Sequence, residues 1–191
     1  MEIGEAKKIL GEVYSFSADD LNNVIQELNL PGDAKILDVG TGMGSMAITI
    51  ALHGFQVITG EPGDDETIYA RQNWQENARK VKVESLIEFK AFNAGKMPFA
   101  DGLFDAVFLL GALHHIPAEE RPEVFRELVR IAKSGGIICF FEPRQKVIDM
   151  IRQKDPAHPD SAEPENYRPE GDLTLRQTTG ENFDAFIYTL A

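Results

Sequence analysis

Residues 35–45 read Lys35-Ile-Leu-Asp-Val-Gly-Thr-Gly-Met-Gly-Ser45 (KILDVGTGMGS), an apolar run that ends in an aspartate and three alternating glycines. The apolar run predicts a short buried strand, and residues 44–54 (GSMAITIALHG) predict a helix that Gly54 closes. Glycines between a strand and a helix let the chain turn sharply and let a ligand lie against bare backbone. The stretch therefore predicts a ligand-binding loop at the end of a strand.

Strands and helices alternate on both sides of this loop. After it we expect strands at residues 55–60, 86–92, 104–113 and 135–142, and helices at 64–81 and 118–133. The strands are nearly continuous apolar runs, which is typical of a parallel sheet covered by helices on both faces. Ligands of such sheets bind outside the carboxyl ends of the strands, where the strand order reverses.

The two ends of the chain differ from this middle part. Residues 2–14 and 16–30 predict two N-terminal helices, the second with Ser17 as its N-cap, and residues 144–154 predict another helix. The Pro-rich stretch 156–172 predicts a long loop. Residues 173–179 and 182–191 alternate apolar and polar side chains and predict an antiparallel strand pair at the sheet edge.

These elements predict one α/β domain over residues 1–191, a Rossmann-like doubly wound sheet in three α/β/α layers. The sheet is expected to be mostly parallel, with an antiparallel C-terminal edge. Residues 1–33 would supply helices that cover the site, residues 34–143 the cofactor-binding core, and residues 144–191 a helix, a loop and the edge strands.

Composition excludes several classes of function. The net charge of −12 argues against unaided nucleic-acid binding, which depends on Lys and Arg against phosphates. Cys139 is the single cysteine, so neither a disulfide framework nor a thiolate zinc site is expected. No apolar run is long enough to cross a membrane, and the N-terminus has no apolar signal segment, so we expect a cytoplasmic protein without membrane contact. An oligomer through the edge strands is compatible with the sequence but not required by it.

The glycine loop is compatible with a dinucleotide and with one other kind of nucleotide cofactor. Dinucleotide-binding loops have the spacing G-x-G-x-x-G, whereas Gly40, Gly42 and Gly44 alternate, and Ser45 stands where a third dinucleotide glycine would be. Glu61 follows the second strand about 20 residues after the loop, where an acid can bind both hydroxyls of a ribose. That acid suits either cofactor, so the loop alone leaves the choice open.

Blocks further along the chain decide between them. The order LDVGTGMGS, GEP, NAGKMPFADGLFDAV, LHHI and SGGIICFFEP resembles the class I S-adenosylmethionine-dependent methyltransferases, in particular the small-molecule branch of type 11/25. The resemblance covers roughly residues 34–143. It implies methyl transfer from S-adenosyl-L-methionine to a small molecule by direct in-line displacement.

The resemblance also implies roles for individual residues. Asp38 would hold the ammonium group of the cofactor, Glu61 its ribose hydroxyls, and Pro62 would lie beside the adenine. The methionine half would lie along four loop residues, Gly40, Thr41, Gly42 and Gly44. The adenine edge would meet Asn93 and Ala94, and the methionyl end would face Leu110 and Gly111. Asn93 stands where the family usually has an aspartate, and this difference predicts a modest loss of affinity for the cofactor. Leu110 replaces a residue that is often polar or aromatic, which predicts a more apolar acceptor pocket.

A general base is needed only if the acceptor must lose a proton. His114, His115 and Glu142 are candidates at strand ends, and we favour His115 as the catalytic residue. In the alternative interpretation, one histidine caps a turn and the other packs, while Glu142 binds backbone. No residues show metal-ligand spacing, and His158, between two loop prolines, is expected to be solvated.

Three other functions stay open at this point. The chain could be a non-catalytic S-adenosylmethionine-binding module, or a subunit of a protein or RNA methyltransferase complex. A nicotinamide-dependent oxidoreductase is less favoured because of Ser45 and the later blocks.

Overall fold

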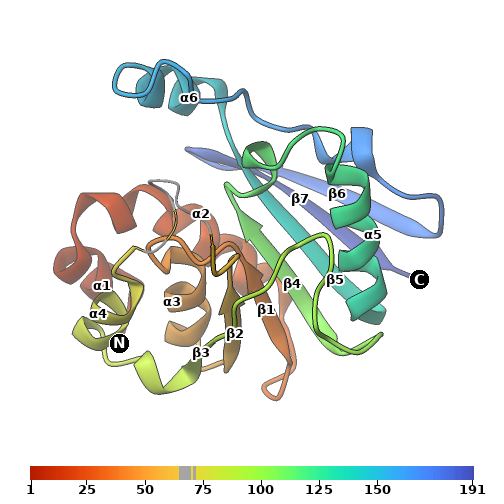
Figure 1. The fold of residues 1–191 in the computed structure, drawn as a ribbon. Coiled ribbons are helices and arrows are strands. Elements are labelled where there is room, and N and C mark those ends of the chain that lie inside the picture. Colours follow the sequence, from red (N-terminus) through yellow and green to blue (C-terminus); the bar gives the residue numbers. More distant parts are fainter. Residues whose placement is uncertain (65–69, 71) are drawn as a thin grey trace.

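The computed structural model describes residues 1–64, 70 and 72–191, and within these residues seven strands form one sheet (Figure 1). The spatial order is β3-β2-β1-β4-β5-β7-β6. The strands are β1 (Ile36–Val39), β2 (Val57–Gly60), β3 (Ile87–Phe89), β4 (Phe104–Leu110), β5 (Ala132–Pro143), β6 (Leu173–Thr179) and β7 (Phe183–Leu190). β1 to β5 are mutually parallel, and β7 runs antiparallel to both of its neighbours. The expected mostly parallel α/β sheet with an antiparallel edge is confirmed.

The strand order reverses at β1, the strand that ends in the glycine loop. β1 pairs with β2 on one side and with β4 on the other, so that Ile36 stands opposite both Val57 and Ala106. The chain proceeds outward through β2 and β3, then returns to β4 on the other side of β1. This is the topological switch point at which open α/β sheets bind ligands.

Helices cover both faces of the sheet, as Figure 1 shows. They are α1 (Ile3–Leu10), α2 (Glu12–Leu28), α3 (Ser45–Leu52), α4 (Trp74–Lys80), α5 (Arg121–Ile131) and α6 (Gln145–Arg152). Side chains alternate between two cores because successive strand residues point to opposite faces. Ile36 packs with the buried side chains of α2 and α3, and Leu37 packs with those of α5.

The break between the two N-terminal helices lies earlier than the sequence predicts. Gly11 has a φ of 80° and separates α1 from α2, which already begins at Glu12. Ser17 is therefore not an N-cap: it lies inside α2, and its hydroxyl donates to the carbonyl of Tyr14 at 3.4 Å. Glycine tolerates a positive φ and so marks the break better than a serine does.

The helix expected at residues 64–81 is described only in part. α4 begins at Trp74, after Asn73, and ends at Lys80. Residues 65–69 and 71 of the expected helix lie outside the described residues. Trp74 stacks on Phe89 of β3, with ring centroids 6.1 Å apart, so the helix packs against the edge of the sheet.

Asp20 joins the N-terminal helices to the C-terminal hairpin. Its carboxylate accepts hydrogen bonds from the backbone N–H groups of Glu181, Asn182 and Phe183, at 2.8, 2.8 and 3.0 Å. The side chain comes from α2 and the three donors from the turn between β6 and β7 and the start of β7. A buried carboxylate with three N–H donors is well satisfied, so this contact holds α2 against the antiparallel part of the sheet.

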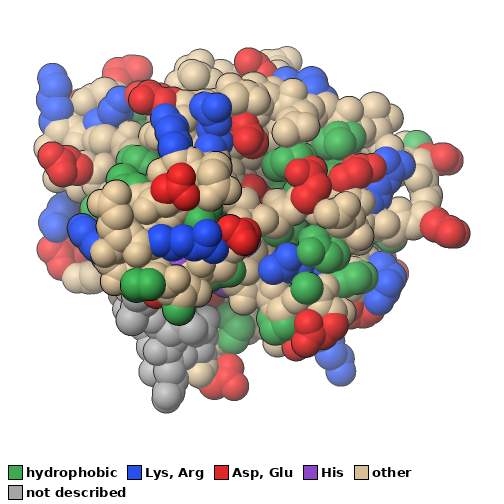
Figure 2. Space-filling model, turned by 90° about the horizontal axis from the view of Figure 1, so that it is seen from above, with side chains coloured by type: hydrophobic (Ala, Val, Ile, Leu, Met, Phe, Trp, Pro, Cys, Tyr) green, Lys and Arg blue, Asp and Glu red, His purple; other side chains and the backbone are tan. Residues whose placement is uncertain are grey.

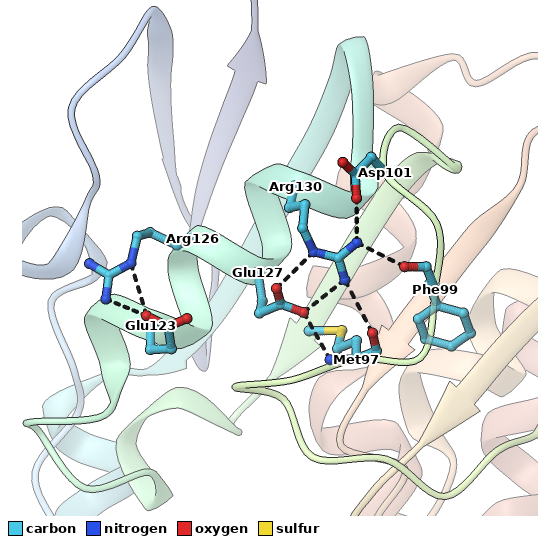
Figure 3. A network of polar contacts seen from close by, with 7 residues as sticks. All are labelled: Met97, Phe99, Asp101, Glu123, Arg126, Glu127 and Arg130. Atoms are coloured by element: carbon cyan, nitrogen blue, oxygen red, sulfur yellow. Dashed lines mark hydrogen bonds and ion pairs between the residues drawn. The ribbon is translucent and has the colours of Figure 1, made fainter.

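Arg130 of α5 holds the loop that leads from β3 to β4 (Figure 3). Its guanidinium donates to the carbonyls of Phe99 and Met97, at 2.8 and 3.1 Å, and binds the carboxylates of Glu127 and Asp101. Glu127 in turn accepts from the N–H of Met97 at 2.8 Å. The hydrogen bond from Arg130 lowers the pKa of Glu127, so the carboxylate stays charged. The part of the loop just before β4 is thereby anchored to the last turn of α5.

Candidate functional site

A cavity of about 620 Å³ lies at the carboxyl ends of β1, β2 and β4. This volume is within the range of small-molecule and cofactor sites. Of the residues that the sequence predicts for the cofactor, nine line the cavity: Gly40, Thr41, Gly42, Glu61, Pro62, Asn93, Ala94, Leu110 and Gly111. Asp38 and Gly44 are not among the lining residues. Gly44 instead precedes the first turn of α3.

The glycine loop keeps its backbone bare toward the cavity. Gly42 has a φ of 46° and Gly40 a φ of 97°, both in the left-handed region that side chains disfavour. Gly40 also approaches the next wall closely, since a Cβ atom there would lie 3.1 Å from Cβ of Ala112. The loop therefore suits a ligand that rests on backbone atoms.

Glu61 at the end of β2 reaches the glycine loop. Its Oε2 atom accepts a hydrogen bond from the backbone N–H of Gly42 at 3.0 Å. The carboxylate thus lies between the loop and the wall formed by Pro62. An acid in this place can accept hydrogen bonds from vicinal hydroxyl groups of a ligand.

Asp38 is fully buried behind the loop, next to the lining residue Val39. Oγ1 of Thr59 donates to Oδ2 of Asp38 at 2.8 Å and lies 2.9 Å from Oγ1 of Thr41. Oδ1 of Asp38 has no hydrogen-bond partner among the described residues. Burial raises the pKa of Asp38 to about 8, against the hydrogen bond from Thr59, and the charge of Glu61 raises it further. A buried acid with an unsatisfied oxygen is suited to a cationic or donor group.

Asn93 and Ala94 lie beyond β3, at the side of the cavity nearest β2. Oδ1 of Asn93 accepts from the N–H of Gly95 at 2.8 Å, which orients the side-chain amide. A carbonyl oxygen has two lone pairs, so this contact leaves acceptor capacity for a ligand.

The opposite end of the cavity is mainly apolar. Leu110 ends β4, and its neighbours at this wall are the side chains of Ala112, Ile116, Pro117 and Val124. The wall beside Leu110 is thus apolar, and its role as an acceptor pocket stays a prediction. His115 and Glu120 are the titratable side chains here, and both are exposed.

His114 and His115 belong to the short 3₁₀ helix Leu113–His115, yet they have different surroundings. His114 is buried, and its Nδ1 atom lies 2.8 Å from Oε2 of Glu142. The same carboxylate oxygen accepts from the N–H of Ala162 at 3.0 Å. Glu142 therefore positions His114 and the loop around Ala162, and it does not line the cavity. The role of His115 as a base stays a prediction.

His158 is buried, contrary to the solvated side chain that its position between two prolines predicts. Its ring centroid lies 5.2 Å from that of His114 and 5.1 Å from that of His115. Burial lowers the pKa of His158, against the hydrogen bond to the carbonyl of Pro159, so its ring is neutral at neutral pH. The loop expected at 156–172 folds back onto the 3₁₀ helix, and this long-range contact has no signal in the sequence.

Several other residues line the cavity without having been predicted from the motifs, including Gly60, Gln72, Phe92, Ile116 and Glu120. Gly60 has the clearest local reason, because a Cβ atom there would lie 2.0 Å from the carbonyl oxygen of Lys90. Phe92 and Gly60 directly adjoin the predicted residues Asn93 and Glu61, so extending each motif by one residue would have found them. Within the described ranges, no helix has the length and apolar character needed to cross a bilayer.

Comparison with known proteins agrees with this geometry. The family model described as "Methyltransferase domain" matches residues 37–140, which is more than half of the chain. The 27-O-demethylrifamycin SV methyltransferase of Amycolatopsis mediterranei is 30% identical over 109 residues, 57% of this chain and 38% of that protein. The 24-methylenesterol C-methyltransferase 3 of Arabidopsis thaliana is 30% identical over 157 residues, 82% of this chain and 40% of that protein.

A solved structure shares the whole fold. A protein of Pyrococcus horikoshii OT3 superposes with a TM-score of 0.74 at 18% identity, covering 95% of this chain and 92% of its own. The chain spans only about two fifths of the length of the two methyltransferases above. The matched residues run from β1 through most of β5 and include the glycine loop, Glu61 and the 3₁₀ helix. The chain therefore belongs to the methyltransferase-domain family of the class I S-adenosylmethionine-dependent methyltransferases.

Proposed function

We propose that this chain binds S-adenosyl-L-methionine in the cavity and transfers its methyl group directly to a small-molecule acceptor. The observation that carries the proposal is the cavity itself, which the glycine loop and Glu61 line at the switch point, with Asp38 buried directly behind the loop. The sulfonium group of the cofactor supplies an activated methyl group. The protein's part is then to hold two molecules in line and to keep water away from them.

The residues present fit the cofactor. The unsatisfied Oδ1 of Asp38 suits the ammonium group, directly or through a water molecule, and ionises when a cation binds beside it. Glu61 suits the ribose hydroxyls, with Pro62 beside the adenine and Asn93 and Ala94 at its edge. The bare backbone of Gly40–Gly44 would follow the methionine half, and Leu110 and Gly111 would face its methyl-bearing end.

The acceptor would enter at the apolar end, between Leu110, Ile116 and Val124. The two relatives above are named for methyl transfer to a rifamycin and to a sterol, which supports a small molecule with an apolar body. On the face shown in Figure 2, acidic and basic side chains are interspersed, and the net charge is −12. Neither observation favours unaided nucleic-acid binding. A cytoplasmic location, as expected from the sequence, is part of the same proposal.

Substitution of Glu61 tests the cofactor assignment. Glu61→Gln removes the charge that would accept from the ribose hydroxyls, and we expect affinity for S-adenosylmethionine to fall roughly 10- to 100-fold. Isothermal titration calorimetry measures this. Glu120→Gln, which removes another cavity carboxylate at the acceptor end, should leave the affinity unchanged. A parent protein that binds NADH and not S-adenosylmethionine would contradict the proposal.

Substitution of His115 tests the base hypothesis. If His115 accepts the acceptor's proton, His115→Ala should lower kcat roughly 10²- to 10⁴-fold with an acceptor in hand, without changing cofactor affinity. His53→Ala is the control, because His53 bonds Oδ1 of Asn22 at the far end of α3 and does not line the cavity. Unchanged turnover in His115→Ala across pH would remove His115 as the base.

A further inference from the structure

Three histidines from two separate segments meet beside the cavity. His114 and His115 come from the 3₁₀ helix after β4, and His158 comes from the loop after α6. One ring nitrogen of each histidine lies within 4.8 Å of those of the other two. On the face seen in Figure 2, histidine side chains show only as small patches among larger groups. Three of the four histidines of the chain therefore lie together.

Two of the rings are oriented by hydrogen bonds typical of metal ligands. Nδ1 of His114 contacts the buried carboxylate of Glu142 at 2.8 Å, and Nδ1 of His158 lies 3.0 Å from the carbonyl oxygen of Pro159. Ligand histidines generally donate their other ring N–H to a carboxylate or a backbone carbonyl. Donation from Nδ1 leaves the lone pair on Nε2, which is a common ligand atom.

The loop that carries His158 is held in this position by further contacts. Arg152 of α6 donates to the carbonyl of His158 at 2.9 Å and pairs with Asp160 at 2.9 Å. The N–H of Ala162 donates to the same Glu142 oxygen that contacts His114. A single carboxylate therefore supports one histidine and the loop that brings in another, so the cluster is built into the fold.

We propose that His114, His115 and His158 bind one divalent transition-metal ion, such as Zn²⁺ or Co²⁺. Three neutral imidazoles with an open fourth position form a site that these ions favour. Metal–nitrogen distances of about 2.0–2.1 Å in tetrahedral geometry place the nitrogens roughly 3.3 Å apart. The separations of up to 4.8 Å must shorten on binding. His115 is exposed and can supply most of this movement.

The site would lie at the acceptor end, because His115 lines the cavity as well as the cluster. This role rests on the proposed function: the open position would receive a hydroxyl oxygen of the acceptor and make its proton easier to lose to solvent water. That oxygen would then form a bond to the methyl carbon as the carbon–sulfur bond of the cofactor breaks and neutral S-adenosylhomocysteine leaves. A metal-bound His115 would act as a ligand and not as the base. The acceptor class would then be a molecule with a hydroxyl or similar oxygen donor on an apolar body.

Metal titration of the untagged full chain tests the site without any methyl acceptor. Chelator-treated protein is titrated with ZnCl₂ by calorimetry and with CoCl₂ by visible absorption. We expect one equivalent to bind, and Co²⁺ to develop the strong visible bands of a tetrahedral nitrogen site. His115→Ala and His158→Ala should each lose more affinity than the roughly 10- to 100-fold that loss of a supporting hydrogen bond costs. The loss of Zn²⁺ affinity in Glu142→Gln should fall within that roughly 10- to 100-fold range.

Controls separate the metal site from folding and from the proposed function. His53→Ala removes the remaining histidine and should bind Zn²⁺ like the parent. Each variant is also checked for thermal unfolding and for S-adenosylmethionine binding, which should not depend on His115. Failure of the parent to bind one equivalent, or undiminished binding by His115→Ala in a folded protein, would overturn the metal site. Failure to bind S-adenosylmethionine would overturn only the proposed function.

Discussion

Gly42→Val is expected to bind S-adenosylmethionine roughly 100-fold more weakly or worse, which corresponds to about 3 kcal/mol of binding free energy. Gly42 lines the cavity with a φ of 46°, and its N–H is the group that Glu61 accepts from. A branched side chain there would occupy the space of the methionine half and displace the carboxylate that is expected to hold the ribose. Calorimetry with the cofactor measures the loss.

The control must carry the same backbone strain without touching the cavity. Gly102 has a φ of 60°, and a Cβ atom there would meet nothing within 4 Å. A left-handed conformation costs a non-glycine residue about 1–2 kcal/mol, so Gly102→Val should lose stability but keep its cofactor affinity. If Gly42→Val bound the cofactor as tightly as the parent, the loop would not be the cofactor site.

Asp38→Asn is expected to change how the stability of the ligand-free protein depends on pH. Burial raises the pKa of Asp38 from 3.8 to about 8 in the folded state. Between pH 3.8 and about pH 8, Asp38 therefore holds its proton more tightly in the folded protein than in the unfolded chain. The free energy of unfolding therefore decreases as pH rises through this window and reaches its low value above pH 8.

The asparagine variant lacks this titration. Its free energy of unfolding should exceed that of the parent by an increasing amount from about pH 4 to pH 8, reaching a few kcal/mol, since one pKa unit corresponds to about 1.4 kcal/mol. Denaturant unfolding at several pH values measures the difference. The exposed Asp33→Asn serves as the control. The same Asp38→Asn protein should bind S-adenosylmethionine more weakly, so gained stability and lost affinity would appear together. A pH-independent difference between parent and variant would contradict the buried-acid interpretation.

Local patterns in the sequence predicted the fold well. The run Ile36–Val39 is apolar on both faces apart from Asp38, as a central parallel strand must be. At the C-terminal edge, β6 alternates apolar and polar residues only at its start, and β7, which lies between β5 and β6, has four consecutive buried residues from Ala185 to Tyr188. Glycines also marked real boundaries, at Gly54 after α3 and at the loop before it. Ser17 misled because cap residues also occur inside helices, where a serine can bond to a preceding carbonyl.

Contacts between distant segments could not be predicted in the same way. Glu142 and His114 are 28 residues apart, and each is compatible with several partners until the sheet brings their strand ends together. The loop that carries His158 has no periodic pattern, and its folded position depends on Arg152 and on Ala162. The histidine cluster is therefore a property of the tertiary structure alone, whereas the glycine loop is visible from local spacing.

The contact between Asp20 and the β6–β7 hairpin has a consequence for biosynthesis. The donors lie 161, 162 and 163 residues after the carboxylate that they bind. At roughly 5–20 residues per second, a ribosome needs on the order of 8–30 s to make the intervening chain. During that interval α2 presents an acid without its three N–H donors, on the surface that will later meet the hairpin. Until the hairpin emerges, this face of the nascent helix is open to chaperones that bind incompletely folded chains.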